Sequence, residues 1–87
     1  MREGRLEKAA KRHSKRLGWI TYKFVSPSMR AVPDRIFIRN GEILFVEFKK
    51  FGEEPTKLQA VRIKELMDAG ATVFVVDRPE QFEFVFD

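Results

Sequence analysis

The sequence contains no cysteine and only one histidine. Disulfides, thiolate metal sites and cysteine nucleophiles are therefore excluded, and the single histidine argues against most zinc sites and against a Ser-His-Asp triad. No apolar run approaches the ~18 residues of a membrane span, and the N-terminus lacks the apolar stretch of a signal peptide. We therefore expect an intracellular, cytoplasmic protein with no membrane partner.

The composition suits one globular domain over residues 1–87, because a second core needs more chain than this. The charge is unevenly distributed along it. Residues 1–39 hold eleven Lys and Arg against three acids, whereas residues 40–87 hold six against ten. This asymmetry predicts a polyanion, above all a nucleic acid, as the partner of the N-terminal half. A merely solvated basic helix is the alternative.

The hydrophobic pattern predicts an α/β domain with a mixed sheet flanked by helices. The expected order is a basic helix over 3–17, a three-strand meander over 19–25, 34–39 and 42–49, a helix over 56–69, a strand over 72–77 and a short final strand over 82–86. Asn40-Gly41 predicts a two-residue hairpin turn. The strand over 72–77 is nearly all apolar, which predicts burial on both of its faces.

The predicted hairpin brings two carboxylates together. With Asn40-Gly41 as the turn, Asp34 lies opposite Glu47, and alternation places Lys49 on the same face. Carboxylates about 5 Å apart repel by roughly 3 kcal/mol at an effective dielectric near 20. An ion-pair cluster with Lys49 would offset this repulsion. A divalent cation would do so as well, and oxygen ligands without His or Cys suit Mg²⁺ or Mn²⁺.

These residues carry a resemblance to a known family. Val32-Pro33-Asp34 followed by Glu47-Phe48-Lys49 on the next strand resembles the PD-(D/E)xK nuclease signature. The wider pattern over residues 5–77 resembles its virus-type replication-repair nuclease (VRR-NUC) branch, on Glu7, the 26–30 loop, the Gly41 hairpin and Gln59 ahead of Leu66 and Gly70.

The resemblance implies a restriction-endonuclease-like core and a metal-dependent DNA endonuclease of phage or bacterial origin. It also implies a homodimer that cuts branched DNA, including four-way junctions, without a small-molecule cofactor. The alternative is a non-catalytic nucleic-acid-binding or interaction module with the same fold.

The resemblance also implies roles for individual residues. Glu7, Asp34, Glu47 and the backbone carbonyl of Phe48 would hold Mg²⁺ or Mn²⁺. Asp34, Glu47, Lys49 and Gln59 would form the catalytic set, with Lys49 positioning or activating the attacking water. Gln59 has a second explanation as a hydrogen-bonded amide at a helix start.

Basic and aromatic residues outside this cluster suggest interaction surfaces. The predicted DNA contacts are Lys8, Lys11, Arg12, Lys15, Arg16, Ser28, Arg30, Lys50 and Lys57, for which a solvated surface is the alternative. Trp19 and Tyr22 suit either base stacking or the core. His13, on the apolar face of the first helix, suits the core or an interface better than catalysis. The alternating Phe82, Phe84 and Phe86 predict a homodimer interface on the final strand.

Overall fold

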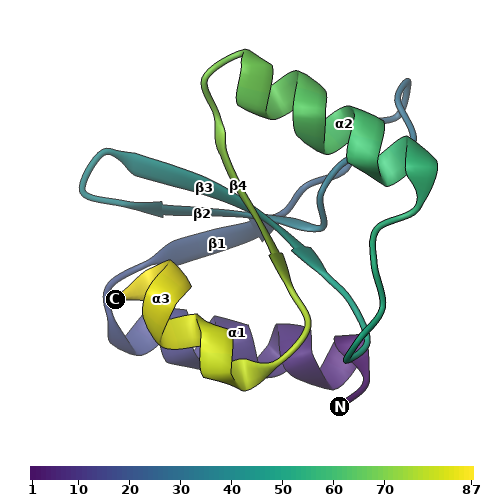
Figure 1. The fold of residues 1–87 in the computed structure, drawn as a ribbon. Helices are drawn as coiled ribbons and strands as arrows, with labels where there is room; N and C mark the ends of the chain where they lie inside the picture. Colours follow the sequence, from purple (N-terminus) through teal and green to yellow (C-terminus); the bar gives the residue numbers. More distant parts are fainter.

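The computed structural model describes residues 1–87, and it confirms the α/β class. The elements are α1 (Glu3–Arg16), β1 (Ile20–Lys23), β2 (Arg35–Arg39), β3 (Glu42–Phe48), α2 (Lys57–Asp68), β4 (Thr72–Val76), the 3₁₀ helix η1 (Pro79–Gln81) and α3 (Phe82–Phe86). One mixed sheet has the order β1-β2-β3-β4, in which the first three strands form an antiparallel meander and β4 runs parallel to β3 (Figure 1).

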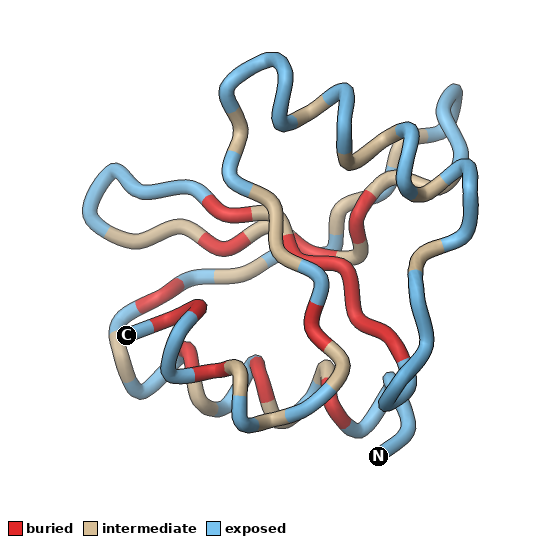
Figure 2. The backbone as a smooth tube through the Cα atoms, in the orientation of Figure 1, coloured by how far each residue is buried: buried red, intermediate tan, exposed pale blue.

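Helices cover the two faces of the sheet unequally. α1 and α3 pack on one face, and α2 lies over the other (Figure 1). The core lies on the α1 and α3 side, where Figure 2 shows most of the buried residues; its members are Leu6, Ala10, Trp19, Phe37, Leu44, Val46, Phe48, Val76, Phe82, Val85 and Phe86. α2 has no buried residue. None of the helices combines the length and apolarity that crossing a membrane requires.

The predicted hairpin register is confirmed. Arg39 pairs with Glu42 and Arg35 pairs with Val46 across an Asn40-Gly41 turn. Both turn residues have positive φ, 49° at Asn40 and 80° at Gly41, which is the conformation that this dipeptide favours. Continuing the register by one pair places Asp34 opposite Glu47, at the end of the hairpin far from the turn.

The predicted final strand is wrong, because residues 82–86 form the helix α3. Pro79 opens the preceding 3₁₀ turn, and in a helix Phe82 and Phe86 fall one turn apart on the same face. Both are buried in their own chain, where Phe86 packs its ring against Phe37 at 4.8 Å between centroids. The dimer interface predicted through these two residues is therefore wrong as well, whereas Phe84 is 80% exposed.

The prediction that the strand over 72–77 is buried on both faces is also wrong. β4 is an edge strand, paired with β3 alone, and Val76 is its only buried residue. The apolar sequence of β4 reflects its contact with α2 on one face and the core on the other, although one edge stays open.

Candidate active site

The candidate site is a cleft where β2 begins and β3 ends, between the N-termini of α1 and α2. The cleft has a volume of about 330 Å³ and is lined by Glu3, Gly4, Glu7, Asp34, Glu47, Phe48, Lys49 and Gln59. All six residues predicted as catalytic or metal-binding therefore lie in one place. The hairpin supplies four of them, and one residue comes from each of the two helices.

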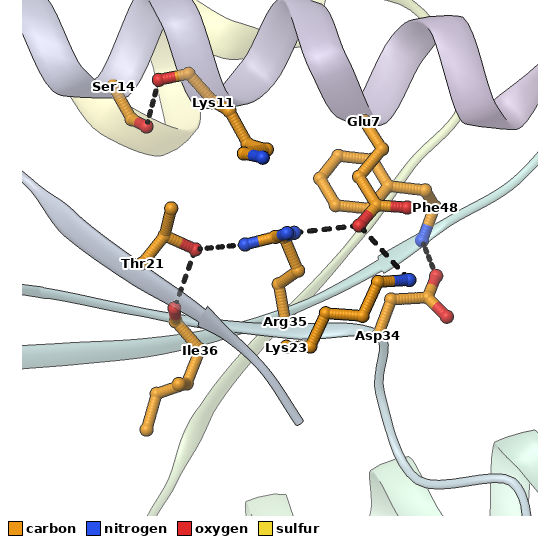
Figure 3. A network of polar contacts seen from close by, with 9 residues as sticks. All are labelled: Glu7, Lys11, Ser14, Thr21, Lys23, Asp34, Arg35, Ile36 and Phe48. Carbon is orange, nitrogen blue, oxygen red and sulfur yellow. Dashed lines mark hydrogen bonds and ion pairs between the residues drawn. The ribbon is translucent and has the colours of Figure 1, made fainter. Parts of the chain in front are cut away.

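Asp34 is held in place by the backbone of the neighbouring strand. Its Oδ2 accepts a hydrogen bond of 2.8 Å from the backbone N–H of Phe48 (Figure 3). Its own carbonyl accepts from the N–H of Phe24, which extends the β1–β2 pairing. The side chain of Asp34 thus replaces a ladder hydrogen bond between β2 and β3, and its orientation follows from the sheet itself.

Glu47 and Lys49 are both buried and form an ion pair. Glu47 is 3% exposed and Lys49 is 6% exposed, and Nζ of Lys49 lies 3.9 Å from Oε2 of Glu47. On its other side the ammonium group lies 3.8 Å from Oε1 of Glu53. Alternation along the chain places both side chains on one face of the sheet, as the hairpin register predicted, and this is the face that α2 covers.

Gln59 links α2 to the site. Its Nε2 donates to Oε2 of Glu47 at 2.8 Å, while its Oε1 accepts from the N–H of Thr56 at 2.9 Å. Oγ1 of Thr56 in turn accepts from the N–H of Gln59, which completes a capping box at the start of α2. The interpretation of Gln59 as a hydrogen-bonded amide at a helix start is therefore confirmed. The same side chain also orients the carboxylate of Glu47.

The site concentrates negative charge in a half-enclosed space. Burial and, after it, the negative charge of Asp34 raise the pKa of Glu47 to about 7. Burial also raises the pKa of Asp34, to which the charge of Glu7 adds and which the hydrogen bond from Phe48 opposes. Lys49 lowers both values without cancelling the rise. The carboxylates therefore gain from a further positive charge placed between them.

Glu7 lines the cleft but its carboxylate is already paired. Oε2 accepts a hydrogen bond of 2.7 Å from Nε of Arg35 and lies 3.6 Å from Nζ of Lys23 (Figure 3). The buried guanidinium of Arg35 also donates to Oγ1 of Thr21 at 3.3 Å. Sequence reasoning missed Arg35, although alternation from Asp34 places it on the core face, where a buried arginine needs an acid.

The oxygen ligands of the site suit a hard cation whose coordination the protein supplies only in part. Asp34 and Glu47 present carboxylate oxygens, which Mg²⁺ and Mn²⁺ prefer. No group of three or more His, Cys, Asp or Glu side chains is arranged to hold a metal ion. Such a cation would therefore need ligands beyond side-chain carboxylates, which fits Mg²⁺ because it keeps several waters.

The residues predicted to contact DNA are all exposed, and the basic ones among them take part in no ion pair. Lys8 and Lys11 line a cleft together with Lys23, next to Glu7. Lys11, Arg12 and Lys15 line another along β1. Unpaired cations thus extend from the candidate site along α1.

The structure also locates Trp19, Tyr22 and His13, for each of which the sequence left more than one role open. Trp19 is buried and donates from Nε1 to the carbonyl of Phe86 at 2.8 Å, so it belongs to the core. Tyr22 is 62% exposed on β1. His13 packs on Phe82 and lies 3.0 Å from Oδ1 of Asp87, away from the cleft.

Comparisons with known proteins find similar chains, one by sequence and one by backbone structure. A protein named "Putative nuclease p44", from Acyrthosiphon pisum secondary endosymbiont phage 1, is 44% identical over 78 residues, which cover 88% of this chain and 84% of that protein. A solved structure described as a VRR_NUC domain is similar with a TM-score of 0.88 and 30% identity, over 95% of this chain and 91% of its own. No protein-family model matches the sequence. The similarity in sequence and in backbone extends over nearly the whole chain.

Proposed function

The chain belongs to the VRR-NUC domain family, and from this premise we propose that it is a Mg²⁺- or Mn²⁺-dependent endonuclease that hydrolyses phosphodiester bonds in DNA. The observation that carries the proposal is the meeting of Asp34, Glu47 and Lys49 in one cleft. Two carboxylates with raised pKa values beside a buried amine suit metal-assisted hydrolysis better than a plain ion-pair cluster, because Lys49 alone leaves the repulsion between them.

Asp34, Glu47 and the backbone carbonyl of Phe48 would hold the metal ion, with Glu7 joining through water because Arg35 and Lys23 occupy its carboxylate. When bound, the ion supplies charge for the developing phosphorane and a more acidic water. Lys49 orients the attacking water and stabilises negative charge on the phosphate. Gln59 holds the Glu47 carboxylate in position for these contacts.

The substrate proposed for this site is DNA in the cytoplasm of a bacterial or phage-infected cell. The unpaired cations along α1, with Ser28, Arg30, Lys50 and Lys57, would contact its phosphates. Their charges give the protein an electrostatic surface that leads to the cleft. We further propose that branched DNA, including four-way junctions, is cut in preference to plain duplex.

We propose that the active form is a homodimer joined through the sheet face opposite α1. On this face apolar side chains form two rows that cross β1, β2 and β3: Ile20, Ile38 and Ile43 in one, and Tyr22, Ile36 and Phe45 in the other. Ile20, Tyr22 and Ile43 are 53%, 62% and 49% exposed, since α2 packs mainly on β4. Neither row holds a charged residue, so an identical apolar face is its best complement.

Cleavage of a DNA panel tests the proposed activity. Labelled four-way junction, flap, nicked and plain duplex are incubated with Mg²⁺, Mn²⁺ or EDTA; we expect cleavage with either metal and none with EDTA. Asp34→Asn, Glu47→Gln and Lys49→Ala should each lower the rate by about 100-fold or more while DNA binding in EDTA is retained. Asn is preferred to Ala at position 34, since its Oδ1 can still accept from Phe48.

A matched control and a metal-binding measurement complete this test. Lys64→Ala removes an exposed cation of α2 that pairs with Asp68, and it should leave cleavage unchanged. Calorimetry should detect Mn²⁺ binding that Asp34→Asn weakens. DNA binding without cleavage in any divalent metal would instead favour the non-catalytic binding module.

A further inference from the structure

A second cleft, unexplained by the proposed chemistry, adjoins the catalytic one. It has a volume of about 810 Å³ and is lined by Met1, Arg2, Gly4, Arg5, Lys50 and Phe51. Gly4 lines both clefts, and the consecutive residues Lys49 and Lys50 line one each. Figure 1 shows the N-terminus beside the loop that follows β3, where these residues meet. A group bound here would lie next to one bound in the catalytic cleft.

This second cleft carries positive charge that the protein does not neutralise. Arg2, Arg5 and Lys50 are exposed, and none of them takes part in an ion pair. No acidic residue lines the cleft. The catalytic cleft beside it, in contrast, is lined by four carboxylates and one lysine. The second cleft therefore suits an anion that needs no metal ion, such as a phosphate.

Phe51 adds an aromatic surface that the fold presents rigidly. It occupies a turn closed by a 2.9 Å hydrogen bond from the N–H of Glu53 to the carbonyl of Lys50, with Gly52 at φ 80°. Oδ2 of Asp77 accepts from the N–H of Gly52 at 3.0 Å and fastens the turn to the end of β4. Phe51 is nevertheless 66% exposed.

The surroundings of the ring suit a planar, negatively charged ligand. The guanidinium of Arg78 lies 5.8 Å from the ring centroid of Phe51 and is paired with Asp77 at 2.8 Å. The uncompensated positive charge beside the ring therefore comes from Arg2, Arg5 and Lys50. An ordered, exposed phenylalanine among cations cannot be explained by core packing. Stacking of a nucleic acid base explains both its exposure and its neighbours.

We propose that Arg2, Arg5, Lys50 and Phe51 form a flanking subsite, which binds the phosphate next to the scissile one and stacks an unpaired base on Phe51. The inference rests on the proposed nuclease function and narrows its substrate. A base inside a duplex is covered by its neighbours on both faces, so only an unpaired nucleotide can occupy the flanking subsite. The preferred substrate is therefore DNA with an unpaired nucleotide beside the cut, as at a flap or branch point.

Binding of short single-stranded DNA tests the flanking subsite without any cleavage. Fluorescence anisotropy of a labelled pentathymidylate is measured in EDTA for the wild type and for variants. Phe51→Ala should weaken binding by about 5- to 100-fold, as the loss of one stacked base does, and Phe51→Trp should restore it. Phe84→Ala removes a phenylalanine of α3 that is more exposed still, at 80% against 66%, and should leave binding unchanged.

An abasic series identifies the base that stacks. One abasic nucleotide is moved through the oligonucleotide, and at one position it should weaken wild-type binding as much as Phe51→Ala does. At that position the two changes should not add, because each removes the same contact. Fully additive losses at every position, or equal binding by Phe51→Ala and the wild type, would overturn the flanking subsite.

These outcomes separate the flanking subsite from the nuclease proposal. Binding that depends on Phe51 without cleavage in any metal would overturn the nuclease proposal alone. Cleavage that is equally fast for Phe51→Ala and the wild type, on flap and plain duplex alike, would overturn the flanking subsite alone. Arg5→Ala adds an independent check, since loss of one phosphate contact with the single strand should reduce the slope of log affinity against log salt by roughly 0.7.

Discussion

At the scale of single residues, the surroundings of Glu47 disfavour its charged form when no cation is bound. It is 3% exposed and lies beside Asp34, and its pKa is raised from 4.5 to about 7. The folded protein therefore holds this proton at pH values where the unfolded chain has released it. Stability of the metal-free protein should fall as pH rises from about 4.5 to about 7, and should level off above this range.

Urea denaturation in EDTA at pH 5 and pH 8 measures this loss. From the raised pKa we expect Glu47 to lower the free energy of unfolding by up to about 3 kcal/mol at pH 8. Glu47→Gln should remove most of the pH dependence, since an amide does not titrate. The same fall in both proteins would contradict the assigned cause. Added Mn²⁺ should stabilise the wild type at pH 8 and should have little effect on Glu47→Gln.

At the scale of elements, Gln59 joins the start of α2 to the site through two separable functions. Its Oε1 and backbone N–H cap the helix, whereas its Nε2 orients Glu47. Gln59→Glu keeps an acceptor for the capping box but turns the donor to Glu47 into a second carboxylate. We expect cleavage to fall by about 100-fold while the helix start is preserved.

The matched variant is Gln59→Ala, which loses both side-chain contacts but keeps the backbone N–H that donates to Thr56. It should cost about 1 kcal/mol of stability through the lost cap, and it should also impair cleavage. Thermal unfolding together with the cleavage rate distinguishes the variants. Normal cleavage by Gln59→Glu would show that the hydrogen bond to Glu47 has no part in the reaction.

The hairpin was predictable from sequence because local and non-local signals agree. Asn40-Gly41 needs a tight turn, and the alternation on both sides of it fixes which residues face each other. The meeting of Asp34 with Glu47 followed directly. The pairing of Glu7 with Arg35 could not be predicted in this way, because a contact between residues 28 positions apart depends on where α1 crosses the sheet.

The final element shows where local pattern misleads. Residues 82–86 carry phenylalanine at every second position, as one face of a strand does, yet Phe82 and Phe86 also have the spacing of one helical turn. Packing decides between the two, since the helix buries both rings against α1 and the sheet. The edge position of β4 could not be predicted either, because its apolar sequence does not show which strands pair with it.

At the scale of the whole molecule, charge and apolar surface are segregated. The unpaired cations lie along α1, whereas the two exposed apolar rows lie on the opposite face of the sheet. Asp34 and Glu47 lie on the same face, two residues beyond Ile36 and Phe45, so the apolar rows end beside the cleft. A partner on the apolar rows would therefore leave α1 free for DNA and would lie close to the cleft.

This arrangement gives a prediction that separates the sheet face from the C-terminal phenylalanines as the dimer interface. Ile43→Lys places a charge at the β3 end of one exposed row, and Phe84→Lys places one on α3. Light scattering should give twice the chain mass of 10.2 kDa for the wild type and for Phe84→Lys, but 10.2 kDa for Ile43→Lys. A dimeric Ile43→Lys would contradict the sheet interface, and a dimer broken only by Phe84→Lys would place it on α3. Because Ile43 lies outside the cleft, the monomeric variant should still nick flap DNA, but it should lose paired cuts across a four-way junction, which need two sites held in one assembly.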